Sequence, residues 1–279
     1  MSEFKLVNLI QRGFTQHKEL NPQIFDENKK LHKDVRDTVI NIANDFIESL
    51  GIDHIDFEDI LLVGSSVNYN WNPYSDIDIH VTYNFEEIDG DKDLVAEFFL
   101  AKKSEWNQMH DVKIHGYDVE LYGQDSNEEI ESGGIYSVVN NEWISEPKHE
   151  DYKISEKSLI KKTKHFTRLI DDIINSDDNN KNKITALNQT KDKIKKYRQS
   201  GLEEGGEYSE ENMVFKLLRR TGYIEKLYNY KAKLEDKELS LDEGLVNVQP
   251  KKYPTKITGN YPNGEWTKKE YDRNGKMER

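Results

Sequence analysis

Between residues 60 and 81, the order of hydrophobic and polar positions predicts two buried strands joined by a short crossover. Residues 60–63 are four apolar, β-favouring side chains in a row, which is typical of a short buried strand. Gly64 follows them and allows the backbone to turn tightly. Ser65 and Ser66 then open a helical crossover, and the first N–H groups of a helix suit a phosphate because they have no partner within it.

The second strand, residues 76–81, alternates strictly between polar and apolar side chains. Because side chains have a period of two along a strand, Asp76, Asp78 and His80 share one face, and the apolar residues form the core face. Two carboxylates two residues apart lie roughly 6–7 Å apart at the backbone. This spacing suits oxygen ligands gathered around Mg²⁺. We expect His80 to be the structural partner of a nearby acid.

Helical periodicity and strand alternation predict the elements around this unit. Apolar residues recur at three- and four-residue spacing over residues 31–50 and 93–110, which predicts an amphipathic helix in each stretch. Alternation predicts strands at residues 112–115 and 117–122, connected tightly at Gly116. The inward-facing residues of the second helix are expected to be Leu94, Val95, Phe98, Phe99 and Trp106.

After the Gly-Gly pair at residues 133–134, two further short strands are predicted, at residues 135–139 and 142–144. Tyr136 and Trp143 are interpreted as aromatic core residues that close the sheet.

From residue 155 onward the pattern becomes helical. Apolar stripes predict three helices, separated by polar segments at residues 176–182 and 203–207. The third helix covers residues 210–234 and contains Gly222, which marks a candidate break. The first 30 residues begin with a short amphipathic piece and are interpreted as a loosely packed arm. The predicted organisation is an N-terminal arm (1–30), a core of strands and helices (31–150), a helical domain (151–236) and a flexible or small-hairpin tail (237–279).

Composition narrows the class of protein. The 279 residues contain no cysteine, which excludes a disulfide framework and a cysteine-ligated zinc site. No apolar run approaches the length of a membrane span, and the N-terminus lacks the apolar region of a signal peptide. The expectation is a cytoplasmic protein that does not bind a membrane.

The net charge of −13 is unevenly distributed. Residues 1–149 hold 12 Lys and Arg against 30 Asp and Glu, a net −18, whereas residues 150–200 hold 13 against 8, a net +5. The acidic N-terminal half repels a polyanion, so broad non-specific DNA binding there is not expected. The basic segment is the better surface for a nucleic acid. An acidic site can still bind a polyphosphate that arrives with metal ions, because these ions reverse the local charge.

The letters GSS at residues 64–66 and SDID at residues 75–78 resemble the G-S…D-x-D signature of the nucleotidyltransferase superfamily typified by DNA polymerase β. The resemblance covers about residues 31–145, less than half of the chain. It implies an α+β nucleotidyltransferase fold, a mixed β-sheet flanked by helices, in residues 31–150. The three helices that follow resemble the helical bundle of many relatives, which binds substrate.

The superfamily also places a third carboxylate on a strand beside the D-x-D strand. Residues 119–122, VELY, resemble that strand in several single-domain members, which favours Glu120, with Asp118 as the alternative. A Glu at this position departs from the Asp of the polymerases, and this argues against polymerase-like activity. The resemblance therefore implies a catalytic and metal-binding set of Asp76, Asp78 and Glu120, and a phosphate-binding set of Gly64, Ser65 and Ser66.

The function that follows is Mg²⁺- or Mn²⁺-dependent transfer of a nucleoside monophosphate from an NTP such as ATP to an acceptor hydroxyl. The acceptor, which is an RNA end, a protein or a small molecule, stays open, as do the base of the NTP and the oligomeric state. Two alternatives remain: pyrophosphoryl transfer of the (p)ppGpp-synthetase type, and a nucleotide-binding module without catalysis. The candidate basic contacts for triphosphate or acceptor are Lys161-Lys162, Lys164, Lys195-Lys196 and Arg219-Arg220.

Overall fold

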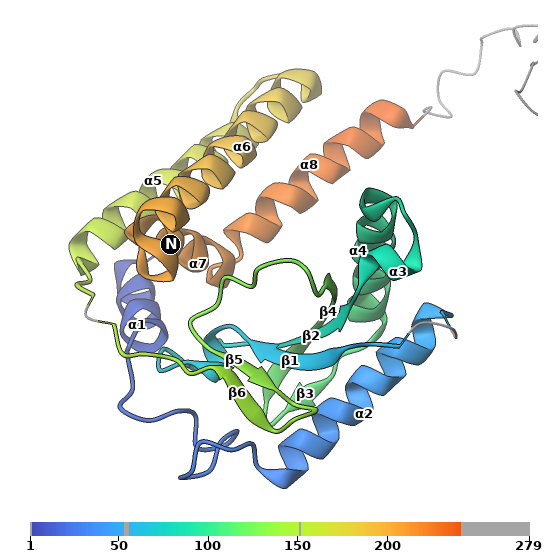
Figure 1. Ribbon diagram of the computed structural model, residues 1–279. Coiled ribbons are helices and arrows are strands. Elements are labelled where there is room, and N and C mark those ends of the chain that lie inside the picture. The colour runs from blue at the N-terminus through green and yellow to red at the C-terminus, as the bar shows by residue number, and fades with distance from the viewer. Residues whose placement is uncertain (1, 53–55, 151, 241–279) are drawn as a thin grey trace, which may run out of the picture. The chain divides into compact units, whose positions relative to one another are not determined.

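A six-stranded mixed sheet with helices on its faces forms the first part of the chain (Figure 1). The structure is a computed structural model that describes residues 2–52, 56–150 and 152–240. The strand order is β3-β4-β2-β1-β5-β6. β2 runs parallel to β4, and the other pairs are antiparallel. The strands are β1 (Asp59–Val63), β2 (Ile77–Tyr83), β3 (Lys113–Ile114), β4 (Tyr117–Asp125), β5 (Ile135–Ser137) and β6 (Glu142–Ser145).

These strands confirm the α+β class and every strand that the sequence predicted. The tight connection between β3 and β4 is made by His115 and Gly116, both with positive φ (51° and 88°), as a two-residue hairpin requires. Tyr136 is fully buried and Trp143 packs against the same core, so both aromatic residues close the sheet as expected.

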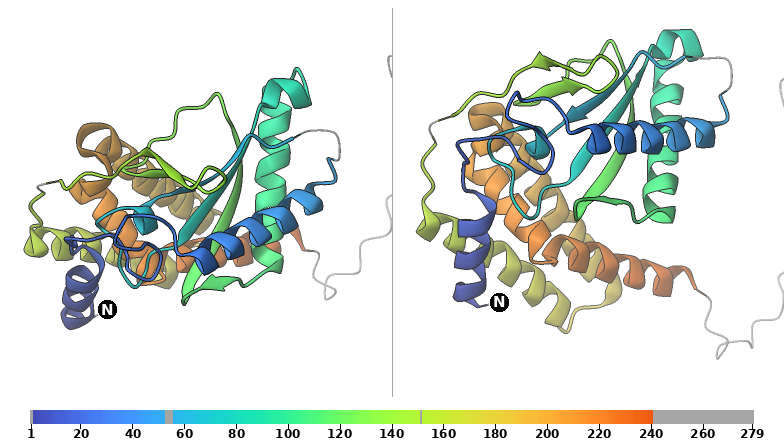
Figure 2. Two further views of the ribbon diagram at one scale, coloured as in Figure 1. Left: turned by 60° about the horizontal axis from the view of Figure 1, so that its bottom comes forward. Right: turned by 90° about the horizontal axis from the view of Figure 1, so that it is seen from below.

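The apolar face of the sheet is covered by two long helices, α2 (Lys33–Leu50) and α4 (Lys92–Met109). In the right-hand view of Figure 2, α2 crosses the strands on one face of the sheet. Ile77 and Ile79 of β2 and Leu121 of β4 point into this core and are at most 1% exposed. The polar residues between them must therefore face the opposite side. One inward position of α4 was predicted wrongly, because Leu94 is 58% exposed.

The remaining regular elements of the described chain are helices. Gly222, with φ of 77°, separates the last two helices, as predicted. The predicted linker 203–207 is instead mostly helical, because α6 continues to Gly205. The remaining elements are the short α3 (Phe85–Ile88) and η1 (Ser65–Val67), then α5 (Glu156–Asn175), α6 (Asn180–Gly205), η2 (Gly206–Tyr208), α7 (Glu210–Arg220) and α8 (Tyr223–Leu239).

Contacts group Met1–Glu235 into one unit and Asp236–Arg279 into a second. The predicted tail lies outside the described residues from residue 241 onward, and the domain boundaries at residues 30, 150 and 236 stay predictions.

The N-terminal segment is packed, which corrects the prediction of a loose arm. It forms helix α1 (Glu3–Gly13), whose Leu6, Leu9 and Ile10 are buried in a second core with α5 and α7. The hydroxyl of Tyr152 also donates to the carbonyl of Phe14 at 2.8 Å. The amphipathic stripe was visible in the sequence, but its partner lies about 150 residues further along the chain.

We expect Leu6→Ala to lower the free energy of unfolding by about 2–5 kcal/mol, because Leu6 is fully buried and its truncation leaves a cavity. Phe4→Ala, on the same helix but 77% exposed, is the control and should change stability by less than about 0.5 kcal/mol. Urea denaturation of the full chain measures both. Equal effects would contradict the packing of α1.

Candidate active site

Asp78 and Glu120 lie side by side on the polar face of the sheet. Asp78 on β2 is the register partner of Glu120 on β4, and the two strands are parallel. Neighbouring strands are about 4.8 Å apart, so both carboxylates occupy the same small region. The structure thus brings together two of the three acidic residues that the sequence singled out, and their roles in metal binding and catalysis stay predictions.

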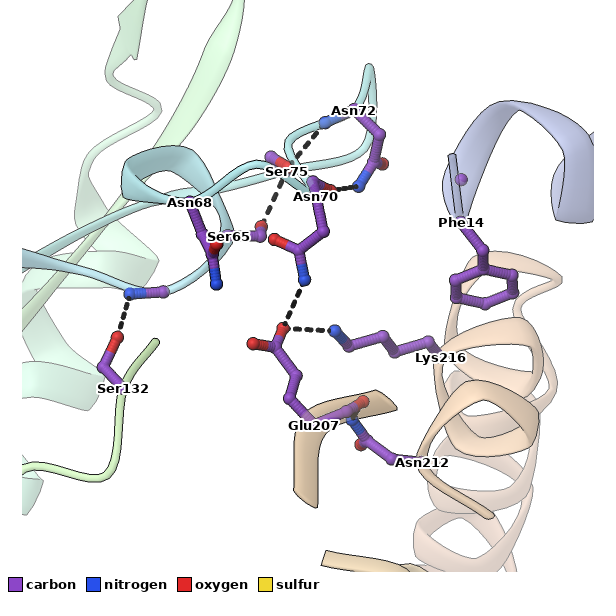
Figure 3. Close-up of polar contacts among 12 residues, drawn as sticks. Phe14, Ser65, Asn68, Asn70, Asn72, Ser75, Ser132, Glu207, Asn212 and Lys216 are labelled. Carbon is purple, nitrogen blue, oxygen red and sulfur yellow. Dashed lines mark hydrogen bonds and ion pairs between the residues drawn. The ribbon is translucent and has the colours of Figure 1, made fainter. Parts of the chain in front are cut away.

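Gly64 makes room for the Asp78 carboxylate. Its φ is +78°, and a Cβ at this position would lie 2.4 Å from Oδ2 of Asp78. Any other residue would therefore be strained and would also displace that carboxylate. The Gly64 N–H donates to Oγ of Ser132 at 3.0 Å (Figure 3).

The two serines after Gly64 have partners within the protein. Ser65 Oγ donates to Ser75 Oγ at 2.8 Å, and Ser66 is buried with Oγ 3.5 Å from the carbonyl oxygen of Val63. A phosphate would have to displace or add to these contacts. The phosphate-binding role of Gly64, Ser65 and Ser66 stays a prediction.

Asp76, just before β2, is paired with Arg219 at the end of α7. The Nη2 atom of Arg219 lies 3.1 Å from Oδ2 of Asp76. Arg219 stood among several basic candidates in the sequence, but nothing in the pattern identified this pairing, since the two residues are 143 positions apart.

Burial and mutual repulsion perturb the ionisation of the acidic cluster. Burial raises the pKa of Asp78 to about 7, and the charges of Glu120 and Asp76 add to the rise. Burial also raises the pKa of Asp76, although the guanidinium of Arg219 opposes that shift. Carboxylates crowded together in this way favour a bound cation.

Lys103 of α4 is a functional candidate that the sequence analysis missed. Its Nζ lies 3.3 Å from the ring centroid of Tyr122, whose hydroxyl donates to Oε2 of Glu120 at 3.4 Å. Burial lowers the pKa of Lys103, and the charges of Glu120 and Asp78 oppose that shift. Helical periodicity marks Lys103 only as a polar position, so the sequence carries no signal for this contact.

The alternative third carboxylate, Asp118, has a different environment. It is exposed and pairs with Lys113 on the adjacent strand β3. Glu120 is therefore the better placed of the two candidates, because it lies beside Asp78. His80 contacts the amide oxygen of Gln124 through Nδ1, so its partner is an amide and the expected acid is wrong. Burial lowers the pKa of His80.

A polar cluster joins the crossover after Gly64 to the helices (Figure 3). Oε1 of Glu207 accepts from Asn70 Nδ2 at 3.2 Å and from Lys216 Nζ at 2.7 Å. Nearby, Arg220 Nη2 donates to Asn72 Oδ1 at 3.3 Å. The loop that carries the Gly-Ser turn is thus hydrogen-bonded to η2 and α7. Helix α7 also carries Arg219.

The carboxylates of Asp76, Asp78 and Glu120 are suitable ligands for a divalent cation, although their side chains are not arranged to coordinate one. Carboxylate oxygens are the ligands that Mg²⁺ and Mn²⁺ prefer. Within residues 2–52, 56–150 and 152–240, no group of three or more His, Cys, Asp and Glu side chains is arranged to hold a metal ion. Asp76 is paired with Arg219 instead. The same part of the chain contains no helix with the length and apolar character needed to cross a membrane.

Comparisons with known proteins leave the family open. No protein-family model matches the chain, and no curated protein matches it. Among solved structures, the STING-associated CdnE c-di-GMP synthase from Capnocytophaga granulosa is similar over 85% of this chain and 100% of its own, at 14% identity and a TM-score of 0.23. A likeness at this level carries no argument about fold or activity. The function must therefore be inferred from the residues of this chain.

Proposed function

We propose that this protein is a metal-dependent nucleotidyltransferase that moves a nucleoside monophosphate from an NTP to an acceptor hydroxyl. One observation carries the proposal: Asp78 and Glu120 are register partners on parallel strands, next to a Gly64 turn that only glycine can make. A solvated edge strand with incidental acids would not need Gly64 to make room for Asp78.

Asp76, Asp78 and Glu120 are the residues that would hold Mg²⁺ or Mn²⁺. When bound, the cation neutralises charge on the triphosphate and on the departing pyrophosphate. Burial raises the pKa of Asp78 and repulsion from Glu120 and Asp76 adds to the rise, and a bound cation would relieve that repulsion, which supports this assignment.

The chain's own residues position the reactants and take the proton. The acceptor oxygen forms a bond to the α-phosphorus, the bond from that phosphorus to the bridging oxygen breaks, and pyrophosphate leaves. Glu120 accepts the proton of the attacking hydroxyl on a carboxylate oxygen. The crossover after Gly64 binds the outer phosphates, and Arg219 moves from Asp76 to the triphosphate. Most of the rate enhancement then comes from positioning and charge neutralisation.

The test uses each α-³²P-labelled NTP with Mg²⁺ or Mn²⁺, the full chain and a cell extract. Label transferred by the wild type and lost in Asp76→Ala/Asp78→Ala supports the proposal. The size of the labelled species distinguishes RNA, protein and small-molecule acceptors. Metal-dependent NTP binding without α-label transfer contradicts nucleotidyl transfer, and a γ-³²P-labelled NTP then tests the pyrophosphoryl alternative.

The Arg219–Asp76 ion pair favours one other candidate, a nucleotide-binding module without catalysis. In such a module Arg219 permanently replaces a cation at Asp76. It predicts NTP binding that is independent of Mg²⁺, whereas the enzyme requires Mg²⁺ for productive binding.

We expect Arg219→Ala to increase the affinity for Mn²⁺ about 3–10-fold in the absence of nucleotide, because it frees Asp76 from a partly exposed ion pair worth about 1 kcal/mol. The KM for the NTP should rise, since the same arginine contacts the triphosphate. Electron paramagnetic resonance of free Mn²⁺ measures the first effect. Arg168→Ala, an exposed arginine on α5, is the control and should change neither value. Lower Mn²⁺ affinity in Arg219→Ala would contradict this role.

A further inference from the structure

A cavity of about 400 Å³ continues the polar face of the sheet beyond the acidic cluster. Its floor includes His80 and Tyr122, which are register partners. They lie two residues further along β2 and β4 than Asp78 and Glu120, a distance of roughly 6–7 Å. α4 runs alongside β4 (Figure 1). Residues of α4 form a wall of the cavity. The volume lies in the range of small-molecule sites, roughly 300–1,000 Å³.

The end of the cavity nearest the acidic cluster is polar. Lys103 lies over the ring of Tyr122, and the hydroxyl of Tyr122 reaches Glu120. Nδ1 of His80 contacts the amide oxygen of Gln124, so Nε2 is the ring nitrogen that can contact a hydroxyl.

The opposite walls are apolar. They are formed by the rings of Phe85 and Phe99 and by Ala96 and Leu100 of α4. Leu100 is 66% exposed although it is a large apolar residue. An occupant with an apolar body would cover Leu100 and keep its polar end beside Tyr122 and His80.

We propose that this cavity binds the acceptor, and that the acceptor is a small molecule with a hydroxyl on an apolar or aromatic body. This inference rests on the proposed nucleotidyl transfer and names its second substrate. The hydroxyl lies between His80 and Glu120, and its oxygen forms the bond to the α-phosphorus. Its proton passes to Glu120, and pyrophosphate leaves with the electrons of the broken bond.

Charge distinguishes a small acceptor from a nucleic acid end. The cavity lies in the half of the chain whose net charge is −18, with 12 Lys and Arg against 30 Asp and Glu in residues 1–149. Asp125 and Glu128 line it together with one lysine, Lys103. A polyanion would be repelled along its whole length, whereas a neutral small molecule would not.

The experiment measures binding and transfer separately in the wild type and two variants of α4. Leu100→Trp fills the cavity from an exposed position, so the protein should still fold. Leu94→Trp introduces the same side chain at a leucine that is 58% exposed and does not line the cavity. Saturation-transfer NMR with benzyl alcohol, a ring with one hydroxyl, reports binding. Transfer from α-³²P-labelled NTP into the small-molecule fraction of a cell extract reports the reaction.

The proposal predicts that Leu100→Trp weakens the benzyl alcohol signal and lowers small-molecule labelling at least tenfold, while Leu94→Trp changes neither. Affinity for the Mg²⁺–NTP complex should be the same in all three proteins. Labelling of RNA or protein alone, or equal benzyl alcohol signals in both variants, would overturn the proposed acceptor pocket. If no protein transfers label but Leu100→Trp alone loses the benzyl alcohol signal, the cavity binds a small molecule and the nucleotidyl-transfer proposal is what fails.

Discussion

Asp78→Asn is expected to stabilise the metal-free protein at pH 8 and to lower nucleotidyl transfer at least 1,000-fold. The loss of transfer follows because an amide cannot replace a carboxylate as a ligand of Mg²⁺ with the same charge. The gain in stability follows because burial and like charges raise the pKa of Asp78 from 3.8 to about 7. The folded protein therefore carries an unfavourable charge once this group ionises.

The direction of the pH dependence follows from these two pKa values. Well below pH 4, Asp78 is neutral in both the folded and the unfolded protein and does not lower the free energy of unfolding. As the pH rises towards 7, the unfolded chain releases the proton and the folded protein keeps it, so stability falls. Above pH 7 the full cost is present, on the order of 4 kcal/mol for a rise of about three pKa units at 1.36 kcal/mol per unit.

Thermal unfolding at pH 5 and pH 8, with EDTA present, tests this prediction. The stabilisation by Asp78→Asn should be larger at pH 8 than at pH 5. Asp118→Asn is the matched control, because Asp118 is exposed and paired with Lys113, and it should give no gain at either pH. A gain in stability that does not depend on pH, or a loss of stability at pH 8, would contradict the raised pKa of Asp78 in the folded protein.

Glu120→Gln should lower kcat about 10²–10⁴-fold, the range expected for loss of a general base, and should weaken metal binding as well. Asp118→Asn should leave kcat within about threefold, because its carboxylate is exposed beside Lys113, away from the pairing of Glu120 with Asp78. Both side chains point to the same face of β4 and lie two residues apart. Comparing the two variants therefore shows which of the two positions the reaction depends on.

Single-turnover measurement at saturating NTP separates this effect on chemistry from any effect on binding. A larger loss in Asp118→Asn than in Glu120→Gln would identify Asp118 as the third carboxylate and contradict our choice.

Local patterns in the sequence were sufficient to predict the helices and strands around the site and the strand faces that carry Asp78 and Glu120. The strict alternation of residues 76–81 gave both the strand and the polar face that carries Asp78. The alternation of residues 117–122 likewise placed Glu120 on a strand face, and the parallel register then brought the two together. These features depend on periodicity, which a single sequence shows directly.

The features that the sequence did not reveal all depend on long-range contacts. Arg219 reaches Asp76 from 143 positions away, and Lys103 reaches Tyr122 from a neighbouring helix. The sequence predicts that residues 1–30 form a loosely packed arm, whereas the structure shows Leu6 of helix α1 buried against later helices. Packing between distant segments leaves no mark in residue spacing.

The most direct test of the central claim is Mn²⁺ binding in the presence of α,β-methylene-ATP, an analogue that cannot release pyrophosphate. Electron paramagnetic resonance of free Mn²⁺ would compare the wild type with Asp78→Asn, Glu120→Gln and Asp118→Asn. We predict at least tenfold weaker Mn²⁺ binding in the first two variants and unchanged binding in the third. Equal binding by all four proteins would contradict a metal site formed by Asp78 and Glu120.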